Sequence, residues 1–326
     1  MPVPLRTDSR HPNCEPRRAG RRTDRRMGTG VLITESWYKT WAGEKLGGFM
    51  EIRLEPFSTA EYANIYSSLG RKVKLVGSVY WTRPRPLFYR PLLLYRALHP
   101  LEFQPPCRLI GAYQYTSSDH FLANSRLNFL VFEEAENYSI RALKIGLRRF
   151  VRVAQRYFEV RVVDSERELK EQGHNIYLSF YSRTRYSYLS ERIEKGSFER
   201  WIEALRANPK TLFLGGYKKG DLKALAICYR IEDLLLYATF FAETESLRHH
   251  ISDLMLHTAR QVAASQIGIR RVLAGRYGGG IGIDTFYLRR GCIIESKPAH
   301  YVITPSVAGS ILQIVAPAQF RRLKGL

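Results

Sequence analysis

Cysteine is scarce in this chain of 326 residues, and its four copies stand apart from one another. Cys14, Cys107, Cys228 and Cys292 form no Cys-x-x-Cys pair, which excludes a disulfide scaffold and the common zinc and thioredoxin-like motifs. Cys228 lies in an apolar, strand-like segment and Cys292 opens another. We therefore expect buried free thiols in a reducing, cytoplasmic environment.

Long apolar runs are also missing. No segment approaches the roughly 18 apolar residues of a membrane span, and no signal-peptide core is present, so the sequence predicts no membrane-spanning helix. The Gly-x-Ser-x-Gly and His-Glu-x-x-His motifs are absent. Their absence excludes the common serine-hydrolase and metalloprotease signatures.

Acidic residues are few relative to basic ones. The chain has 30 Asp and Glu against 51 Lys and Arg, which gives a formal net charge of +21. Such an excess indicates an anionic partner such as nucleic acid, a lipid surface or a phosphorylated cofactor. The hydrophobic fraction of 45% and the charged fraction of 25% are nevertheless typical of a globular protein, and the length suits two domains.

The first 30 residues concentrate the charge. They hold eight arginines and three acids with almost no apolar periodicity, so a disordered basic tail is predicted over 1–30. Three interpretations are open: a nucleic-acid or membrane-binding arm, a transit-like leader, or an upstream stretch that is not translated because Met27 rather than Met1 is the true start. We favour the last. The rest of the chain still carries +16.

The region from 34 to about 138 is predicted to be mixed α/β. Helices are expected over 34–47 and 59–69, the second with Ser58 as N-cap and Gly70 as its stop. Strands are expected over 49–54, 73–81, 87–95, 107–113 and 127–132.

A helix predicted over 139–157 carries two stripes. The apolar stripe consists of Ile140, Leu143, Leu147, Phe150, Ala154 and Tyr157, and the basic stripe consists of Arg141, Lys144, Arg148, Arg152 and Arg156. The basic stripe either binds phosphates or is a solvated face above a core-packed one. We favour the solvated face, because single-sign faces are usually of that kind.

The second half changes from helical to extended periodicity. Helices are predicted over 177–184 and 196–207, followed by strands over 211–217, 222–231 and 234–241 whose short connections require an antiparallel meander. A helix over 247–268 follows, with Ser246 as N-cap and Gly268 as its stop. The last expected elements are a strand at 271–274, a glycine-rich loop at 275–280, a short helix at 281–290 and a strand at 292–304.

This order resembles the core of the GNAT acyltransferase fold. The segments 236–241, 271–275 and 282–291 resemble the C-terminal half of the Fem-like (FemAB-type) acetyltransferase branch, whose members carry two tandem GNAT-like units. Phe286 and Gly291 match the late Phe-Lys…Gly element of that branch, with Tyr287 in place of the lysine. The segment 143–155 is similar to the basic helix that joins the two units.

The resemblance implies an α+β fold of tandem GNAT-like units, with mixed, mostly antiparallel sheets and flanking helices. It divides the chain into a degenerate N-terminal GNAT-like unit at 34–138 and a basic linker helix at 139–158. A C-terminal acyltransferase unit at 159–305 and a C-terminal tail at 306–326 complete the expected organisation.

The implied activity is transfer of an acyl or aminoacyl group from a thioester or tRNA donor to an amine of unknown identity. GNAT enzymes usually bind acyl-CoA where two parallel strands splay apart, with the pyrophosphate at the N-terminus of the next helix. The matching segment, 243–248, has no glycine and contains two acids, Glu243 and Glu245, which repel a pyrophosphate. Acyl-CoA and aminoacyl-tRNA therefore both stay open as donors, and no metal is expected.

The resemblance also selects candidate site residues. The catalytic candidates are Glu243, Tyr287 and Tyr237, and the donor- or substrate-binding candidates are Thr239, Ser246, Arg248, His250, Arg276, Gly279 and Arg289. Simple alternation along the strand predicts Tyr237 and Thr239 on one face, with Leu236 and Ala238 on the other. For Arg276 and Arg289, surface charge is the alternative interpretation.

One further pattern and one further function stay open. His250, Asp253 and His257 share one side of the 247–268 helix and suggest a metal site or a proton relay, although a plain polar patch is the favoured interpretation. The alternative function is a non-catalytic basic protein that keeps the fold and binds RNA or an acidic surface. A third hypothesis is an enzyme with an anionic donor other than CoA.

Overall fold

The computed structural model describes residues 52–101, 103–107, 109–184, 190–279, 282–315, 317 and 320–321. The basic tail, the helix predicted over 34–47 and the first half of the strand predicted over 49–54 lie outside these residues. Residues 52–54 form no strand. Instead the Leu54 N–H donates to the Gln266 side chain at 2.8 Å, so this segment is held by a side chain. No helix in the described ranges combines the length and the apolar character needed to cross a bilayer.

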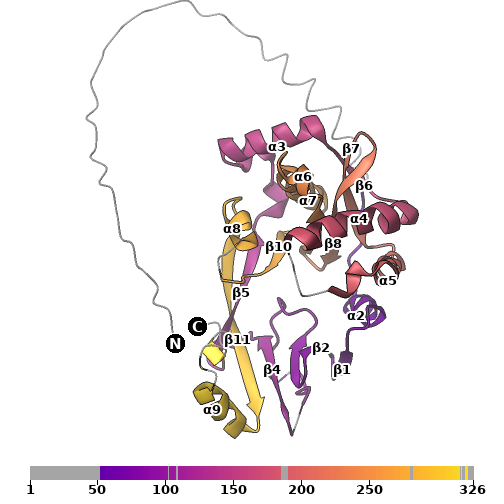
Figure 1. Cartoon of the computed structure of the whole chain (residues 1–326). Coiled ribbons are helices and arrows are strands. Elements are labelled where there is room, and N and C mark those ends of the chain that lie inside the picture. The colour runs from indigo at the N-terminus through magenta and orange to yellow at the C-terminus, as the bar shows by residue number, and fades with distance from the viewer. Residues whose placement is uncertain are drawn as a thin grey trace, which may run out of the picture. The chain divides into compact units, whose positions relative to one another are not determined.

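The described chain contains runs of strands separated by helices (Figure 1). The helices are α2 (Thr59–Ser68), α3 (Ile145–Tyr157), α4 (Glu166–Thr184), α5 (Lys195–Arg206), α6 (Thr244–Leu247), α7 (Ile251–Ser265), α8 (Ile283–Leu288) and α9 (Ser306–Val315). The strands are β1 (Val73–Val76), β2 (Val79–Arg85), β3 (Phe88–Pro91), β4 (Gly111–Thr116), β5 (Ser125–Phe132), β6 (Glu159–Val162), β7 (Leu212–Lys218), β8 (Asp221–Ile231), β9 (Leu234–Ala242), β10 (Arg271–Arg276) and β11 (Ile293–Thr304).

The strands in the described ranges form one 11-stranded sheet in the order β1-β2-β3-β4-β11-β5-β10-β9-β8-β7-β6. Only β3–β4 and β9–β10 pair in parallel, and every other neighbouring pair is antiparallel. The predicted α+β class with a mixed, mostly antiparallel arrangement is therefore confirmed. The predicted meander of β7, β8 and β9 is present, because two short turns join these strands.

The two halves of the chain share this sheet. The late strand β11 lies between β4 and β5, and β5 in turn lies between β11 and β10. Strands from the 34–138 segment thus alternate with strands from the 159–305 segment. The assignment of these segments as two units stays a prediction.

Local sequence signals explain where several elements begin and end. Ser58 caps α2 through a capping box with Glu61, as predicted, and Gly70 follows with φ of 71°. The single strand predicted over 73–81 is wrong, because Gly77 at φ 60° turns the chain between β1 and β2. The helix predicted to begin at 177 begins at Glu166. The prediction missed its first turns because they contain mostly polar residues, with Leu169 buried among them.

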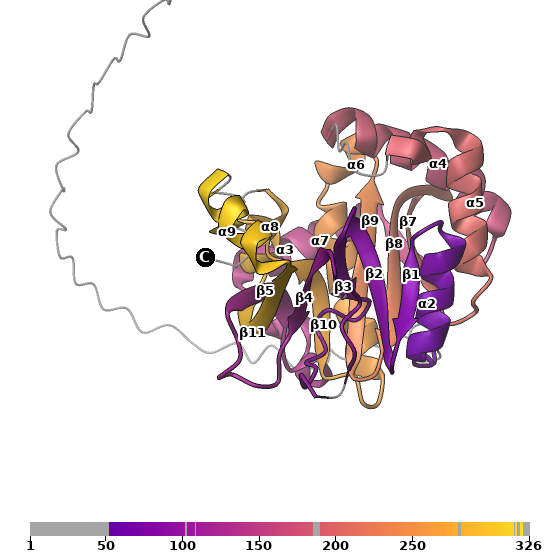
Figure 2. The ribbon, with the colours of Figure 1, turned by 90° about the horizontal axis from the view of Figure 1, so that it is seen from below.

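Helices cover both faces of the sheet and define two main cores. On one face α7, with α3 above it, packs on Leu235 and Tyr237 of β9. On the other face α4 and α5 pack on Leu225 and Phe241. Seen from below, β2 and β3 lie in front of β8 to β10, so the sheet is curved rather than flat (Figure 2). Tyr80 of β2 packs against the core on the α4 and α5 face, so β2 lies over that face of the sheet.

Candidate functional site

The parallel strands β9 and β10 separate partway along their length. They pair only over residues 234–236 and 271–273. Beyond these residues β9 continues to Ala242 and β10 to Arg276 without pairing to each other. Among the described residues, the facing edges of β9 and β10 therefore have no strand partner beyond this point, and such edges can pair with an extended ligand.

A β-bulge on each strand causes the separation. On β9 the pairing with β8 passes from Tyr237 opposite Cys228 to Thr239 opposite Ile227, so Ala238 has no partner. On β10 the pairing with β5 skips Ala274 in the same way. Because a bulge bends and twists its strand, two bulges just past the last paired residues drive the strands apart. Ala238 is exposed although its neighbours on the strand are buried or half-buried.

The bulge on β9 also reverses the side-chain pattern. Tyr237 belongs to the core under α7, whereas Thr239 is opposite Ile227, which belongs to the core under α4. The prediction that Tyr237 and Thr239 share a face is therefore wrong. The extra residue moves every later side chain of β9 to the other face.

Two tyrosines belong to the core on the α7 face of the sheet, and Tyr237 is the first residue of β9 beyond its pairing with β10. Tyr237 comes from β9, and Tyr287 comes from α8, where its ring packs edge-on against Phe132 of β5 at 6.3 Å. Each side chain is about 4% exposed. The Tyr237 Oη is buried and has no hydrogen-bond partner among the described residues. A buried phenol without a partner is costly in free energy, so it marks a place where a ligand can complete the hydrogen bonding.

Burial sets the protonation of this pair. Burial, followed by the neighbouring Tyr287 and Cys228, raises the pKa of Tyr237 well above its ordinary value. Burial and the neighbouring Cys292 raise the pKa of Tyr287 as well. Both phenols are therefore neutral at physiological pH, which makes them hydrogen-bond donors rather than bases.

Glu243 lies at the far end of β9. Its carboxylate accepts a hydrogen bond from Ser246 Oγ at 3.1 Å and lies 3.6 Å from Lys223 Nζ. Glu243 follows Ala238 by five residue steps along the strand, which corresponds to roughly 16 Å. The structure thus groups Glu243 with Ser246 and not with the tyrosine pair.

The segment between β9 and α7 departs from the predicted single helix over 247–268. Ser246 is not an N-cap, since it lies inside the short α6, and α7 begins only after His250 at φ 61° and ends before Gln266. The His250 ring stacks on Phe150 of α3 at 4.1 Å, and His249 stacks on Tyr157 at 4.3 Å. Arg248 is exposed and pairs with Glu245 at 3.1 Å.

Part of this segment has its backbone N–H groups engaged, which bears on the pyrophosphate of acyl-CoA. A pyrophosphate needs free backbone N–H groups that point toward it. Here the N–H groups of residues 243, 244, 248, 249 and 250 all donate within the protein. The rings of Phe150 and Tyr157 lie on the histidines that precede α7, and Glu243 and Glu245 add negative charge.

The loop after β10 holds the remaining candidates. Arg276 ends β10, and Gly279 follows at φ 118°, which favours glycine. Asp284, only 3% exposed, accepts the Gly278 N–H at 2.8 Å and so ties the loop to the first turn of α8. Arg289 is exposed at the other end of α8.

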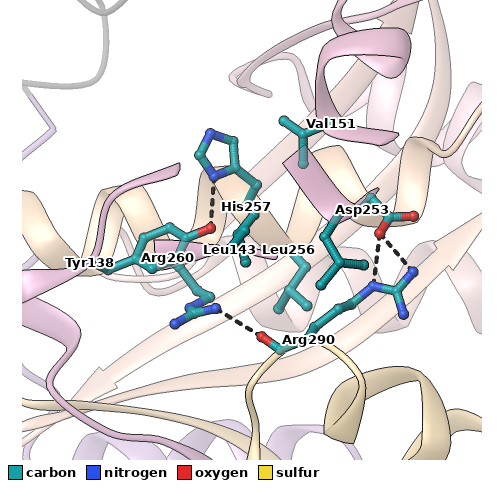
Figure 3. Close-up of a pocket in the computed structure, with 9 residues that line it drawn as sticks. Tyr138, Leu143, Val151, Asp253, Leu256, His257, Arg260 and Arg290 are labelled. Atoms are coloured by element: carbon teal, nitrogen blue, oxygen red, sulfur yellow. Dashed lines mark hydrogen bonds and ion pairs between the residues drawn. The ribbon is translucent and has the colours of Figure 1, made fainter. Parts of the chain in front are cut away.

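A polar network joins α7 to α8 and to the segment before α3 (Figure 3). Tyr138 Oη and His257 Nδ1 lie 2.8 Å apart, and the Arg290 guanidinium contacts the Asp253 carboxylate at 2.6 and 2.8 Å. Arg260 donates to the Arg290 carbonyl at 3.3 Å. These side chains surround a cavity of about 10 Å³, which is the size of one water.

The three residues that suggested a metal site or a proton relay, His250, Asp253 and His257, contact other side chains in and beside this network. His250 lies 3.8 Å from Asp253, which is engaged by Arg290, while His257 faces Tyr138. Among the described residues no three His, Cys, Asp or Glu side chains are grouped to hold a metal ion. Asp253 and His257 are buried in this network, so they do not form a surface patch.

Sequence reasoning missed the features that shape the site. The bulges at Ala238 and Ala274 carry no sequence signal, since both are ordinary strand residues. The partners Tyr138, Arg260 and Arg290 were equally hidden, because each contact joins separate elements.

The mixed sheet, the separated parallel strands and the helix that follows them define the GNAT-like fold of Fem-type acyltransferases. No protein-family model matches the chain, and no curated protein matches it in sequence. Among solved structures, the chain is similar to the C-terminal domain of a putative lysylphosphatidylglycerol synthetase from Agrobacterium fabrum. The TM-score is 0.51 at 10% identity, over 83% of this chain and 93% of that one.

A second solved structure, FemX, is similar to the same degree. Its TM-score is 0.51 at 10% identity, and the match covers 83% of this chain and 97% of FemX. At this identity the likeness shows the fold. The predicted Fem-type, GNAT-like fold is thereby confirmed.

Proposed function

We propose that this protein transfers an acyl or aminoacyl group to an amine in the opening between β9 and β10. The observation that carries the proposal is the coincidence of two bulges, unpaired strand edges and the unpartnered Tyr237 Oη at one place. The strand edges hold an extended donor by backbone hydrogen bonds, and the exposed Ala238 marks the side from which the amine reaches it.

The reaction has a simple balance. The amine nitrogen attacks the donor carbonyl carbon, a C–N bond forms, and the ester or thioester bond to the carrier breaks. The nitrogen loses one proton to solvent at the exposed end of the opening, and the departing carrier oxygen or sulfur gains one. The carbonyl oxygen carries the developing negative charge and needs a hydrogen-bond donor.

Tyr237 is the proposed donor to that oxygen, and Tyr287 supports it. Because the pKa of each phenol lies above its ordinary value, the proton is present over the whole physiological pH range. We propose no direct contact of Glu243 with the reacting atoms, since its carboxylate is held by Ser246 at the other end of β9.

The β9–α7 segment favours an aminoacyl ester of tRNA over acyl-CoA as donor. Several backbone N–H groups of this segment already donate within the protein, and Glu243 and Glu245 add negative charge, so the segment favours a pyrophosphate less than a glycine-rich loop would. The exposed side chains Arg141, Lys144, Arg149, Arg152 and Arg156 lie on and just before α3, which packs on α7 and can meet a polyanion. The structural similarity to a putative lysylphosphatidylglycerol synthetase is in line with an aminoacyl donor.

The proposal is tested with tRNA charged with radiolabelled amino acids and, in parallel, radiolabelled acyl-CoA. Each donor is incubated with the protein and a mixed extract of amines. The product is then treated with mild alkali, which hydrolyses esters and leaves amides intact, and the remaining label is counted. We expect base-stable label from the aminoacyl donor. Tyr237→Phe should lower the transfer rate by about 100-fold, since removal of one oxyanion donor has an effect of that order.

Tyr229→Phe is the matched control. Tyr229 is also a buried phenol, but it lies in the core under α4 and α5, so its loss should leave the transfer rate within about twofold of wild type. Equal rates for Tyr237→Phe and wild type would refute the assigned role. If neither donor yields base-stable label while uncharged RNA binds with a steep salt dependence, the alternative of a non-catalytic RNA-binding protein is correct.

A further inference from the structure

One end of the sheet brings three separate segments together. β11 runs toward this end and pairs its last residue, Thr304, with Gly111 at the start of β4. β3 is parallel to β4 and begins at the same end, where the Ala112 N–H donates to the Leu87 carbonyl at 2.7 Å. The β2–β3 turn, the loop before β4 and the first turn of α9 therefore lie at one end of the sheet, which we call the α9 end (Figure 1).

Apolar side chains protrude from all three segments of the α9 end. Leu109 and Ile110, in the loop before β4, are 83% and 64% exposed. Leu87 in the β2–β3 turn and Val307 in the first turn of α9 are each more than half exposed. Side chains this exposed stand out from the surface and do not line a groove. They therefore suit a broad, yielding surface better than a peptide bound in a cleft.

The helix α9 extends this apolar surface. Val307, Ile314 and Val315 stand at positions i, i+7 and i+8, so they lie on one side of the helix. All three side chains are exposed. The apolar side of a surface helix ordinarily faces the core, whereas α9 presents these apolar side chains outward. An outward apolar stripe is typical of a helix that lies in a membrane interface.

The α9 end is also built from segments with charge of one sign. The segments 84–90, 107–112 and 302–326 contain six Lys and Arg and no Asp or Glu. Among these cations, Arg85 and Arg321 are exposed. Anionic headgroups attract basic side chains near a lipid surface, while neighbouring apolar side chains insert below the headgroups. The combination complements an anionic lipid surface in both charge and polarity.

We propose that the α9 end of the sheet binds the surface of an anionic lipid membrane. Leu87, Leu109 and Ile110 insert at the level of the headgroups together with the apolar stripe of α9. Arg85 and Arg321 stay at the level of the lipid phosphates. This contact is peripheral, and it does not depend on the proposed acyl transfer.

Flotation with lipid vesicles at physiological salt tests the proposal. The full chain is mixed with vesicles of phosphatidylcholine alone or with about 30% phosphatidylglycerol, and we expect tighter binding to the anionic vesicles. Leu109→Ser together with Ile110→Ser should weaken this binding by about 10-fold or more, because two apolar side chains no longer insert. Ile267→Ser is the matched control: Ile267 is 95% exposed and precedes β10, at the end of the sheet where β11 begins. Its binding should equal that of wild type.

A second pair of variants tests the basic residues. Arg85→Gln together with Arg321→Gln should weaken binding to the anionic vesicles by about 10-fold and leave the weaker binding to phosphatidylcholine unchanged. Arg167→Gln together with Arg200→Gln removes the same charge from exposed positions on α4 and α5, and this control should bind like wild type.

Three results would overturn the membrane contact of the α9 end. The first is wild-type protein that binds neither type of vesicle. The second is unchanged binding by the Leu109→Ser, Ile110→Ser protein, which would assign the contact to another segment such as the basic residues 1–30, kept in every variant. The third is a dimer in sedimentation velocity that these two substitutions dissociate without any vesicle binding, which would make this end an interface between copies. Thermal unfolding verifies that each variant folds, as the exposure of the changed side chains leads us to expect.

Discussion

A buried histidine on α7, His257, contributes to the pH dependence of this protein's stability. His257 is 3% exposed on α7 and faces Tyr138, whose phenol can donate to the neutral imidazole. Burial, with a smaller contribution from Arg260, lowers the pKa of His257 to about 4. The folded protein therefore keeps this imidazole neutral at pH values where the unfolded chain protonates it.

The resulting prediction concerns acid stability. Between the ordinary histidine pKa of 6.5 and about 4, the unfolded state binds the proton and the folded state does not, so stability falls as pH falls. The contribution of His257 is on the order of 3 kcal/mol between pH 7 and pH 4. His257→Gln should flatten this part of the curve when urea unfolding is measured at several pH values.

The control for that experiment is His120→Gln, at an exposed loop position. It should leave the slope of stability against pH unchanged. A slope in His257→Gln equal to that of wild type would show that other groups cause the loss of stability in acid.

Asp253 and Arg290 illustrate a residue pair that positions others. The Arg290 guanidinium contacts Asp253 on α7 and also donates to the Phe286 carbonyl at 2.8 Å. It thereby holds the end of α8, the helix that carries Tyr287, against α7. In the sequence Asp253 suggested a metal ligand, whereas its contacts make it a structural anchor for the tyrosine pair.

At the scale of elements, α3 combines a buried and a charged side. Val151 and Ala154 pack into the core with α7, while Arg152 and Arg156 are exposed. The favoured prediction of a solvated basic face over a packed stripe agrees with this pattern for most of its residues, but Arg148 is half-buried and Tyr157 is exposed. The helix predicted over 139–157 begins at Ile145. Exposure also leaves the same face available to a polyanion.

We predict that Arg152→Glu together with Arg156→Glu weakens tRNA binding and lowers the magnitude of the salt slope of log K by about 1 to 2. Thermal stability should stay close to wild type, because both side chains are exposed. Filter binding at several salt concentrations measures the slope. Arg200→Glu on α5, 71% exposed on the other side of the sheet, serves as control, and an equal loss in both variants would contradict a role of α3.

At the scale of the whole molecule, the sheet ties together strands from both halves of the chain. β11 pairs with β4 and β5, and β5 pairs with β10, so neither half can keep its sheet without the other. We predict that heat unfolds the described part of the chain in one cooperative transition. Differential scanning calorimetry checks this, since equal calorimetric and van't Hoff enthalpies indicate two-state unfolding. Two resolved transitions would show that the 34–138 and 159–305 segments fold independently.

Much of the fold could be predicted from local signals. Short turns required the meander of β7 to β9, Ser58 and Gly70 bounded α2, and the order of elements indicated the GNAT-like fold. Signals failed where one residue changed the geometry: Gly77 divided a predicted strand, and His250 interrupted a predicted helix. Gly77 makes a tight local turn that the prediction overlooked, whereas His250 precedes α7 with its ring stacked on Phe150, a residue far away in the sequence.

The sequence by itself determined the element types, the meander and the basic stripe, because these follow from periodicity, turn chemistry and charge between near neighbours. Only the tertiary structure decided that Ala238 and Ala274 bulge and that Tyr237 and Tyr287 belong to one core. The physical reason is that strand order, register and sheet curvature join residues whose separation in sequence carries no local signal.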